Sequence, residues 1–265
     1  MADPATGGIS GEQLQIPSES DWPSPPKHPE LVGDETHVWC ARLDELASDL
    51  PRFSKLLSES ERKRADRFQL ERDRDRFVAR HGLLRMILGG YLKMDPARLA
   101  FAYESRGKPM LCLQDVAPPL QFNMSHSNGV ALIAGNRQAA PGVDVERVRF
   151  VPEADQIAAK FFSPQECAVL NAIPEEQKME AFFNCWTRKE AYLKATGEGI
   201  ADALPRIEVS LTPGQPARLS KINGDTLAAS RWRLSGLAPA PGFVGALAIK
   251  TDTLRLARWR WSRNH

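Results

Sequence analysis

The feature that most constrains the fold is an order of helices followed by strands that occurs twice along the chain. Helical patterns run from "LLSESERKRADRF" to Gly90, and short apolar segments separated by turns follow them, from "LAFAY" to "PGVDVE". Helices return between "PEADQIAAKFF" and "KATG", and strand-like segments close the chain, from "RIEVSL" to "LRLARWRW". This order predicts an α+β protein with two similar α/β halves, each a small sheet packed with helices, joined near Pro141.

The first 33 residues have a different texture. Six of the 20 prolines fall within the first 30 residues, and such a composition does not pack a core. We therefore expect a flexible Pro-rich tail over residues 1–33, an N-terminal half over residues 34–140 and a C-terminal half over residues 141–265.

Composition excludes several classes of protein. The chain has 265 residues and is 42% hydrophobic, which is enough for a sizeable core, yet no apolar run approaches the ~18 residues that a membrane span needs. The four cysteines form no CxxC pair, so neither a zinc site nor a disulfide framework is expected. A net charge of +2 argues against a protein that coats nucleic acid. With no signal-peptide pattern, we expect a cytoplasmic protein with no membrane and no nucleic-acid partner.

The segment "WTRKEAYLKATG" reads as the last turns of a helix that Gly197 closes. Glu190 follows Phe183 by seven residues and Trp186 by four, so it lies on the face that should meet the core. A charge there is costly unless something pairs with it, and a metal ion would explain its position. Lys194 lies one turn further on the same face, so an ordinary Glu–Lys helix pair is the alternative.

In "GVDVE", Asp144 and Glu146 are two residues apart and would share one face of a strand, with Val143 and Val145 on the other. Two carboxylates held close repel each other unless a cation lies between them, and oxygen-rich sites of this kind suit Mg²⁺. Plain alternation on a half-exposed strand is the alternative. Glu190 favours the metal, because it could be a third ligand.

Further polar residues suit an anionic ligand. Lys108 stands in the turn "RGKP", and "NMSHS" ends a strand with Ser125 and His126. Lys189 could hold a phosphate at the rim of a site or be solvated. In "SPQE", Glu166 has the spacing of a capping box with Ser163, so a structural role competes with a catalytic one.

In combination, "GKP", "FNMSHS", "GVDVE", "FFSPQE" and "WTRKEAYLKATGEG" resemble the 4′-phosphopantetheinyl transferases. The chain is most similar to the larger monomeric type that modifies carrier proteins of peptide and polyketide synthesis, and the resemblance runs from Leu57 to Ile200. It implies a fold of two similar halves with the active site between them, and a monomer. It also implies Mg²⁺-dependent transfer of the phosphopantetheine arm of coenzyme A to a serine of an apo acyl or peptidyl carrier protein, releasing adenosine 3′,5′-bisphosphate.

The resemblance also implies roles for individual residues. Asp144, Glu146 and Glu190 would hold the metal, and Lys194 would be the catalytic lysine beside the pyrophosphate. The residues expected to hold the nucleotide phosphates are Lys108, Ser125, His126, Lys189 and Lys194, with Arg64 and Arg76 as basic partners. Glu190, Glu166 or a metal-bound water would take the proton of the serine.

Two other functions stay open at this level. A magnesium-dependent nuclease would also use clustered carboxylates and a lysine, and a non-catalytic member of the fold would bind carrier proteins without product. Because carrier proteins tend to be acidic around their serine, a basic surface would speed encounter, and we expect docking near Pro152 to Ile173.

Overall fold

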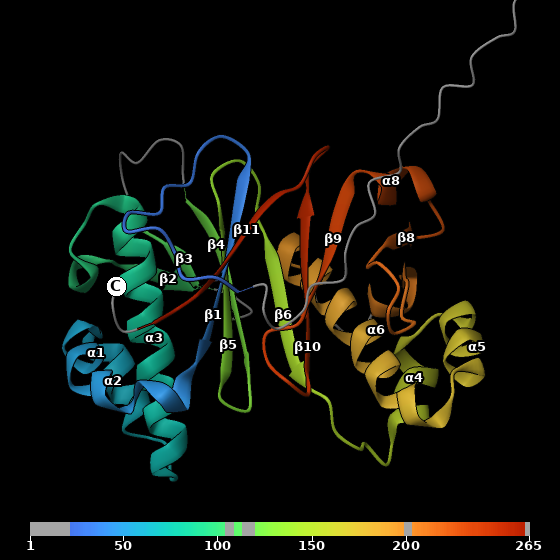
Figure 1. Ribbon diagram of the computed structural model, residues 1–265, viewed down its shortest axis with the longest axis horizontal. Helices are drawn as coiled ribbons and strands as arrows, with labels where there is room; N and C mark the ends of the chain where they lie inside the picture. Colours follow the sequence, from blue (N-terminus) through green and yellow to red (C-terminus); the bar gives the residue numbers. More distant parts are fainter. Residues whose placement is uncertain (1–21, 104–108, 113–119, 199–202, 263–265) are drawn as a thin grey trace, which may run out of the picture.

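The computed structural model describes residues 22–103, 109–112, 120–198 and 203–262. Two sheets stand side by side in the middle of the molecule, and each has its own group of helices on the outer side (Figure 1). The α+β fold class, with small sheets packed by helices, is confirmed. Among these residues no helix is both long and apolar enough to cross a membrane.

The first sheet has the order β11-β1-β5-β4. Its strands are β1 (Glu35–Arg42), β4 (Gln121–Ser127), β5 (Val130–Asn136) and β11 (Arg255–Arg260). The helices beside it are η2 (Leu43–Asp49), α1 (Leu50–Leu56), α2 (Glu59–Ala65), α3 (Glu71–Leu92) and η3 (Pro96–Arg98). A separate ribbon pairs β2 (Phe101–Tyr103) with β3 (Pro109–Leu111). Long apolar residues of α3, including Leu84 and Leu88, pack against Trp39 and Ile133 of the sheet.

The second sheet has the order β6-β10-β9 and is antiparallel. Its strands are β6 (Gly142–Arg147), β9 (Trp232–Leu237) and β10 (Phe243–Lys250). The helices of this half are α4 (Ala154–Phe161), α5 (Pro164–Ala172), α6 (Glu175–Thr196), η4 (Leu204–Arg206) and α8 (Thr226–Ser230). A small outer ribbon pairs β7 (Ile207–Val209) with β8 (Leu219–Ile222). The long helix α6 covers β6 and β10.

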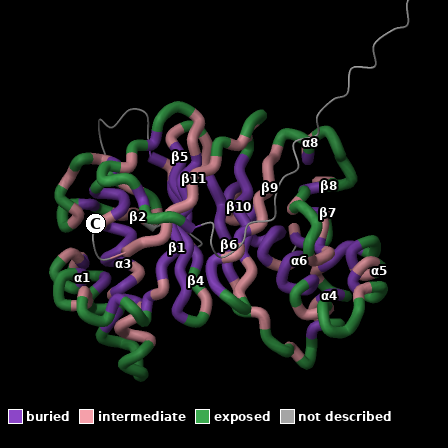
Figure 2. Tube along the Cα trace, viewed as in Figure 1, coloured by how far each residue is buried: buried purple, intermediate pink, exposed green. Residues whose placement is uncertain are grey.

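A third core joins the two sheets. Val38 and Leu132 of the first sheet pack with Val143, Val145 and Leu247 of the second, and all five are fully buried. Figure 2 shows that the central strands of both sheets are mostly buried. Polar side chains of β4 add hydrogen bonds to the backbone of β6. Asn123 Oδ1 accepts from Val143 N at 2.9 Å, and Ser127 Oγ accepts from Arg147 N at 3.3 Å. The edge of β4 is therefore held directly against β6.

The described part of the expected tail is not loose. Trp22 is only 5% exposed, and its indole Nε1 donates a hydrogen bond to Ala238 O at 2.8 Å in the second half of the molecule. Leu31 is buried in the core of the first half. Residues 22–33 thus pack across both halves, because a tryptophan and a leucine bury apolar area whatever the average composition around them. Residues 1–21 lie outside the described part.

The C-terminal strand also departs from the expected division at residue 141. β11 pairs in parallel with β1, with His37 opposite Ala257 and Trp39 opposite Trp259. It completes the sheet of the first half, and Trp259 and Trp261 pack on that half's core. Apolar strand patterns do not specify which sheet a strand joins, so the sequence alone placed residues 255–260 in the wrong half.

Candidate active site

Helix α6 brings the expected acid to the second sheet. The helix ends at Gly197, whose φ of 77° is left-handed and whose N–H bonds to Leu193 O. Glu190 is 7% exposed and lies on the buried side of the helix. A close approach of helix and strand makes this possible: a Cβ on Gly142 would overlap the backbone oxygen of Ala191, so only glycine fits at the start of β6.

The alternation expected along β6 is present. Val143 and Val145 are buried in the core between the sheets, and Asp144 lies on the opposite face, within reach of α6. Two serines of β4 bond to the carboxylates of β6: Ser125 Oγ donates to Asp144 Oδ1 at 2.8 Å, and Ser127 Oγ donates to Glu146 Oε2 at 2.8 Å. Ser127 was not expected from the sequence, although its spacing from Ser125 in "SHS" puts both on one face.

Lys194 lies one turn after Glu190 on α6 and contacts Asp144 of the cluster. Its Nζ lies 2.5 Å from Asp144 Oδ1 and donates to Ser125 Oγ at 3.1 Å. The Lys194 side chain is 29% exposed, whereas the Asp144 side chain is 5% exposed. Lys194 and Asp144 therefore form a partly buried ion pair at the junction of the two halves, and the simple Glu190–Lys194 helix pair is not the main contact of this lysine.

The carboxylates of the cluster are close enough for the charge of Asp144 to raise the pKa of both Glu190 and Glu146. Burial, followed by the charge of Asp144, raises the pKa of Glu190 to about 7, and Lys194 opposes this shift. Burial also raises the pKa of Glu146, with a further contribution from the charge of Asp144. The cluster is thus a region of excess negative charge that a cation would relieve.

Two carboxylate oxygens of this cluster fit a metal ion. Asp144 Oδ2 and Glu190 Oε1 are buried, and neither has a hydrogen-bond partner among the described residues. As the side chains stand, no group of three or more His, Cys, Asp or Glu residues in that part of the chain converges on one point. The ammonium of Lys194 lies on Asp144 Oδ1, the other oxygen of that carboxylate. Hard carboxylate oxygens without partners are nevertheless what Mg²⁺ takes from a protein.

A group of cations lies beside the cluster, on the first half of the molecule. The guanidinium carbons of Arg80 and Arg64 lie 4.7 Å and 5.6 Å from the centre of the Phe77 ring. Within the described chain neither arginine pairs with a carboxylate. Burial and then the charge of Arg64 lower the pKa of Arg80 to about 10. Sequence reasoning missed Arg80, although its i+3 spacing from Phe77 in α3 put it on the same helix face as that ring.

His126 connects these cations to the carboxylates. Its side chain is exposed, yet the surrounding protein still desolvates the imidazole. That desolvation, followed by the charges of Arg80, Lys194 and Arg76, lowers the pKa of His126 to about 4. The ring is therefore neutral at physiological pH, and it can offer a hydrogen bond but no charge to an anion.

Arg76 differs from Arg80 in being already paired. Its Nε and Nη2 donate to the two carboxylate oxygens of Asp44 at 2.7 Å and 2.6 Å, a bidentate ion pair that ties α3 to η2. A phosphate could use this fork only by displacing Asp44. Arg80, one turn further along α3, has no such carboxylate partner among the described residues.

The structure contradicts the expected phosphate contact of Lys189. This side chain is completely buried, and its Nζ lies 2.6 Å from Glu166 Oε2 and donates to Phe161 O and Leu204 O. All three N–H donors of the ammonium thus have partners inside the protein. Neighbouring positions on a helix point about 100° apart, so Lys189 faces away from the cluster that Glu190 joins.

Glu166 is likewise structural. It completes the capping box at the start of α5, accepting from Ser163 N at 2.7 Å, and its other oxygen accepts from Val209 N at 2.8 Å. With 3% exposure and with Lys189 on its carboxylate, it has no route to a substrate serine. The catalytic role expected as an option for Glu166 is therefore wrong, and capping is its role. Lys108, the remaining candidate, lies outside the described residues.

A small apolar cavity opens beside Glu146. It has a volume of about 180 Å³. Its lining residues are Glu146, Arg149, Val151, Ile157, Phe182, Phe183 and Trp186. Phe150, which follows the lining residue Arg149 in the sequence, is 78% exposed. An apolar space with an exposed aromatic residue therefore adjoins the carboxylates on the side of the second half.

The sequence matches two family profiles that together span most of the chain. Residues 44–138 match the N-terminal profile of 4′-phosphopantetheinyl transferases, and residues 140–248 match the 4′-phosphopantetheinyl transferase superfamily. The 4′-phosphopantetheinyl transferase HetI of Nostoc sp. is 43% identical over 228 residues, 86% of this chain and 93% of HetI. The transferase Sfp of Bacillus subtilis is 29% identical over 60% of this chain and 69% of Sfp.

Among solved structures, the chain is similar to a holo-(acyl-carrier-protein) synthase from Bacillus anthracis, with a TM-score of 0.35 and 20% identity over 43% of this chain and 96% of that one. A likeness of this size adds nothing to the sequence matches. The match to HetI covers most of both proteins. The chain therefore belongs to the 4′-phosphopantetheinyl transferase superfamily.

Proposed function

We propose that this phosphopantetheinyl transferase takes its phosphopantetheine arm from coenzyme A, and that Asp144, Glu146 and Glu190 hold the Mg²⁺ ion that the reaction uses. The proposal depends on one observation. The three carboxylates of the cluster lie at the junction of the halves near the cations of the first half, and Lys194 forms an ion pair with Asp144 there. A pyrophosphate needs cations on its oxygens, and the carboxylates need a cation of their own.

The cations of the first half suit the nucleotide end of coenzyme A. Arg64 and Arg80 form no ion pair with a described carboxylate. The charges of both Arg80 and Lys194 act on His126, so this histidine lies near the cations of both halves. Guanidinium groups bind phosphate oxygens through paired hydrogen bonds, so this pair suits a phosphate. We assign Arg80 to this surface with Arg64, in the position where the sequence suggested Arg76.

The chemical step follows from the residues around the carboxylates. The serine oxygen of the carrier protein attacks the phosphorus that bears the pantetheine arm, and the bond from that phosphorus to the adenosine bisphosphate oxygen breaks. A bound Mg²⁺ ion supplies neutralisation of charge on the pyrophosphate oxygens. Lys194 stabilises the leaving phosphate or gives it a proton. Of the two side chains that the sequence suggested as the base, Glu166 is buried in its cap, so we assign Glu190 as the side chain that accepts the serine proton.

The carrier protein would approach from the side of the second half. Phe150 is the most exposed large apolar residue of the described chain, and Arg149 beside it is also exposed. An apolar anchor next to a positive charge suits an acidic partner surface with an apolar centre. This extends the docking region expected near Pro152 to Ile173 by a few residues toward β6.

The deciding experiment is the conversion of an apo carrier protein, followed by intact mass spectrometry. Purified protein, coenzyme A, Mg²⁺ and an apo peptidyl carrier protein should give a mass increase of one phosphopantetheine, and EDTA should prevent it. Unmodified carrier across peptidyl, polyketide and fatty-acid types would contradict the proposal and favour the binding module. Cleavage of DNA or RNA without any carrier product would favour the nuclease.

A further inference from the structure

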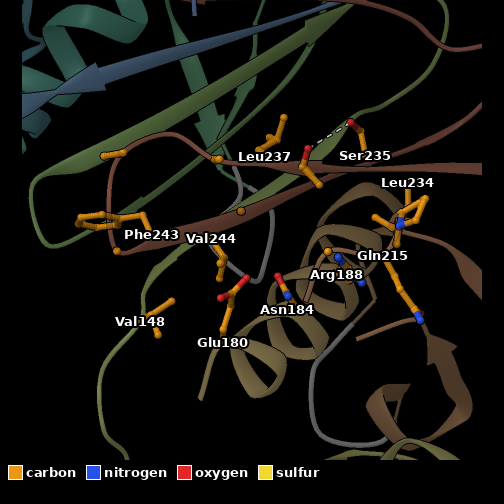
Figure 3. Close-up of a pocket in the computed structure, with 18 of the residues that line it drawn as sticks. Val148, Glu180, Asn184, Arg188, Gln215, Leu234, Ser235, Leu237, Phe243 and Val244 are labelled. Atoms are coloured by element: carbon orange, nitrogen blue, oxygen red, sulfur yellow. Dashed lines mark hydrogen bonds between the residues drawn. The ribbon is translucent and has the colours of Figure 1, made fainter. Parts of the chain in front are cut away.

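A second, larger cavity lies on the other side of α6. It has a volume of about 480 Å³ and is enclosed by α6, β9, β10 and the loop at residues 214–217 (Figure 3). None of the three clustered carboxylates lines it, nor does Lys194. Its size falls within the range of about 300–1,000 Å³ that is typical of small-molecule sites. The proposed transfer reaction makes no use of it.

One buried guanidinium lines this cavity, and the three N–H donors on its Nε and Nη2 have no acceptor among the described residues. Arg188 is 5% exposed, and its Nη1 donates to Ser210 O at 2.6 Å and to Ser210 Oγ at 3.0 Å. These two bonds fix the plane of the guanidinium. Among the described residues no carboxylate pairs with Arg188, and no hydrogen bond from Nε or Nη2 is formed. Nη2 faces Gly236, 3.9 Å from where a Cβ would stand on that strand.

Nε and Nη2 together are the side-on fork of an arginine, which matches the two oxygens of a carboxylate. Asn184, one turn earlier on α6, reinforces this preference. Its amide nitrogen donates to Leu211 O at 3.4 Å and has a second hydrogen to offer. In Figure 3 the side chains of Glu180, Asn184 and Arg188 follow one another along α6 on the face that borders the cavity.

The remaining walls are mainly apolar, and they include Val148, Leu234 and Val244. Glu180 lies two turns before Arg188 on the same helix and is exposed. Burial lowers the pKa of Arg188 to about 10, and the charge of Glu180 opposes this shift without forming an ion pair. The negative charge of Glu180 disfavours an anion at that end of the cavity. An amphipathic anion is therefore oriented, with its charged group at Arg188 and its apolar part along the walls.

We propose that this cavity binds a carboxylic acid with an apolar chain, with the carboxylate on the Nε–Nη2 fork of Arg188 and the chain against Val148, Leu234 and Val244. An inorganic anion would leave the apolar walls empty, and a neutral hydrocarbon would leave Nε and Nη2 of the buried guanidinium without acceptors. The proposal does not depend on the transfer reaction, since none of the cluster residues takes part.

Titration calorimetry of the full chain with octanoate tests the proposal. We expect saturable one-to-one binding, and binding of 1-octanol at least about tenfold weaker, because a lost charge-assisted fork costs about 1.4 kcal/mol or more. Arg188→Lys keeps the charge but removes the fork, and it should weaken octanoate binding by a similar factor. Gly236→Val puts a β-branched side chain on a strand and fills the cavity, and it should abolish binding.

Gly236→Val leaves Arg188 in place, so it keeps the test valid if the Arg188 variant does not fold. Leu227→Ala, at an exposed leucine outside the cavity, is the matched control and should bind as the wild type does. Three results would each overturn the proposal: absence of saturable binding at millimolar octanoate, equal affinity for octanol and octanoate, or unchanged octanoate binding in a folded Gly236→Val protein.

Discussion

Glu190→Gln should make the metal-free protein more stable at alkaline pH while it destroys activity. The pKa of Glu190 is raised from its ordinary value of 4.5 to about 7, chiefly by burial. Because the folded pKa lies above the unfolded one, this carboxyl contributes full stability below about pH 4.5 and loses it as the pH rises through 7. Glutamine stays neutral at every pH, so the variant has no such loss.

The size of the effect follows from the shift. A rise of about 2.5 units, at about 1.4 kcal/mol per unit, corresponds to about 3 kcal/mol of unfolding free energy at pH 8. The two proteins should have similar stability near pH 5, and the variant should be ahead by about 3 kcal/mol at pH 8. For a chain of this size that corresponds to roughly 6 °C or more in Tm.

The assay is urea unfolding in EDTA at a series of pH values from 5 to 8. Glu180→Gln, at an exposed glutamate of the same helix, is the control and should follow the wild type. Mg²⁺ at about 100 times its Kd should then stabilise the wild type by about 2.7 kcal/mol and Glu190→Gln by clearly less. Parallel stability curves for wild type and Glu190→Gln in EDTA would refute the electrostatic reasoning, and equal stabilisation by Mg²⁺ would remove Glu190 from the metal site.

Three further predictions concern residues that the structure reassigned or explained. Arg80→Ala should raise the KM for coenzyme A at least about tenfold, as expected for a lost charge-assisted phosphate contact, while the KM for carrier protein stays unchanged. Arg67→Ala, at an exposed arginine between α2 and α3, is the control, and an equal effect of that variant would contradict this prediction. Glu166→Gln should cost about 3 kcal/mol in urea unfolding, because it leaves the buried ammonium of Lys189 without its counter-charge; a loss of only ~1 kcal/mol, the effect of a cap alone, would show that the ion pair contributes little. Gly142→Ala should lower soluble yield and turnover together, since the new methyl overlaps the α6 backbone; a variant with normal activity and Tm would show that the helix can move away.

Local patterns were enough to predict most of the acidic cluster. Alternation along "GVDVE" put both carboxylates on one face, and the helical period put Glu190 on the inward side of α6. The same reasoning failed for Lys189, because a charged residue beside an apolar face can turn either to solvent or to a buried partner. That partner, Glu166, comes from another helix, and no local pattern shows the pairing.

Long-range contacts account for the other differences. Trp22 is held by Ala238, some 216 positions away in the chain, and residues 255–260 add to a sheet that begins at Glu35. Arg80 and Arg64 come together only through the packing of α2 and α3 around Phe77. Neither composition nor periodicity contains the identity of a distant partner, so these features needed the three-dimensional structure.

The pairing of β11 with β1 sets an order of events during synthesis. β1 is synthesised early and pairs with β5 and β11, but His37 has its β11 partner only after Ala257 has been synthesised. At a translation rate of roughly 5–20 residues per second, that gap lasts about 10 to 40 s. Throughout it the emerging chain has an unpaired β1 edge, which is a template for association with other chains. Stalled or shortened products of this gene should therefore aggregate, and fusions that hold back the last strand should need chaperones even when the active-site residues are intact.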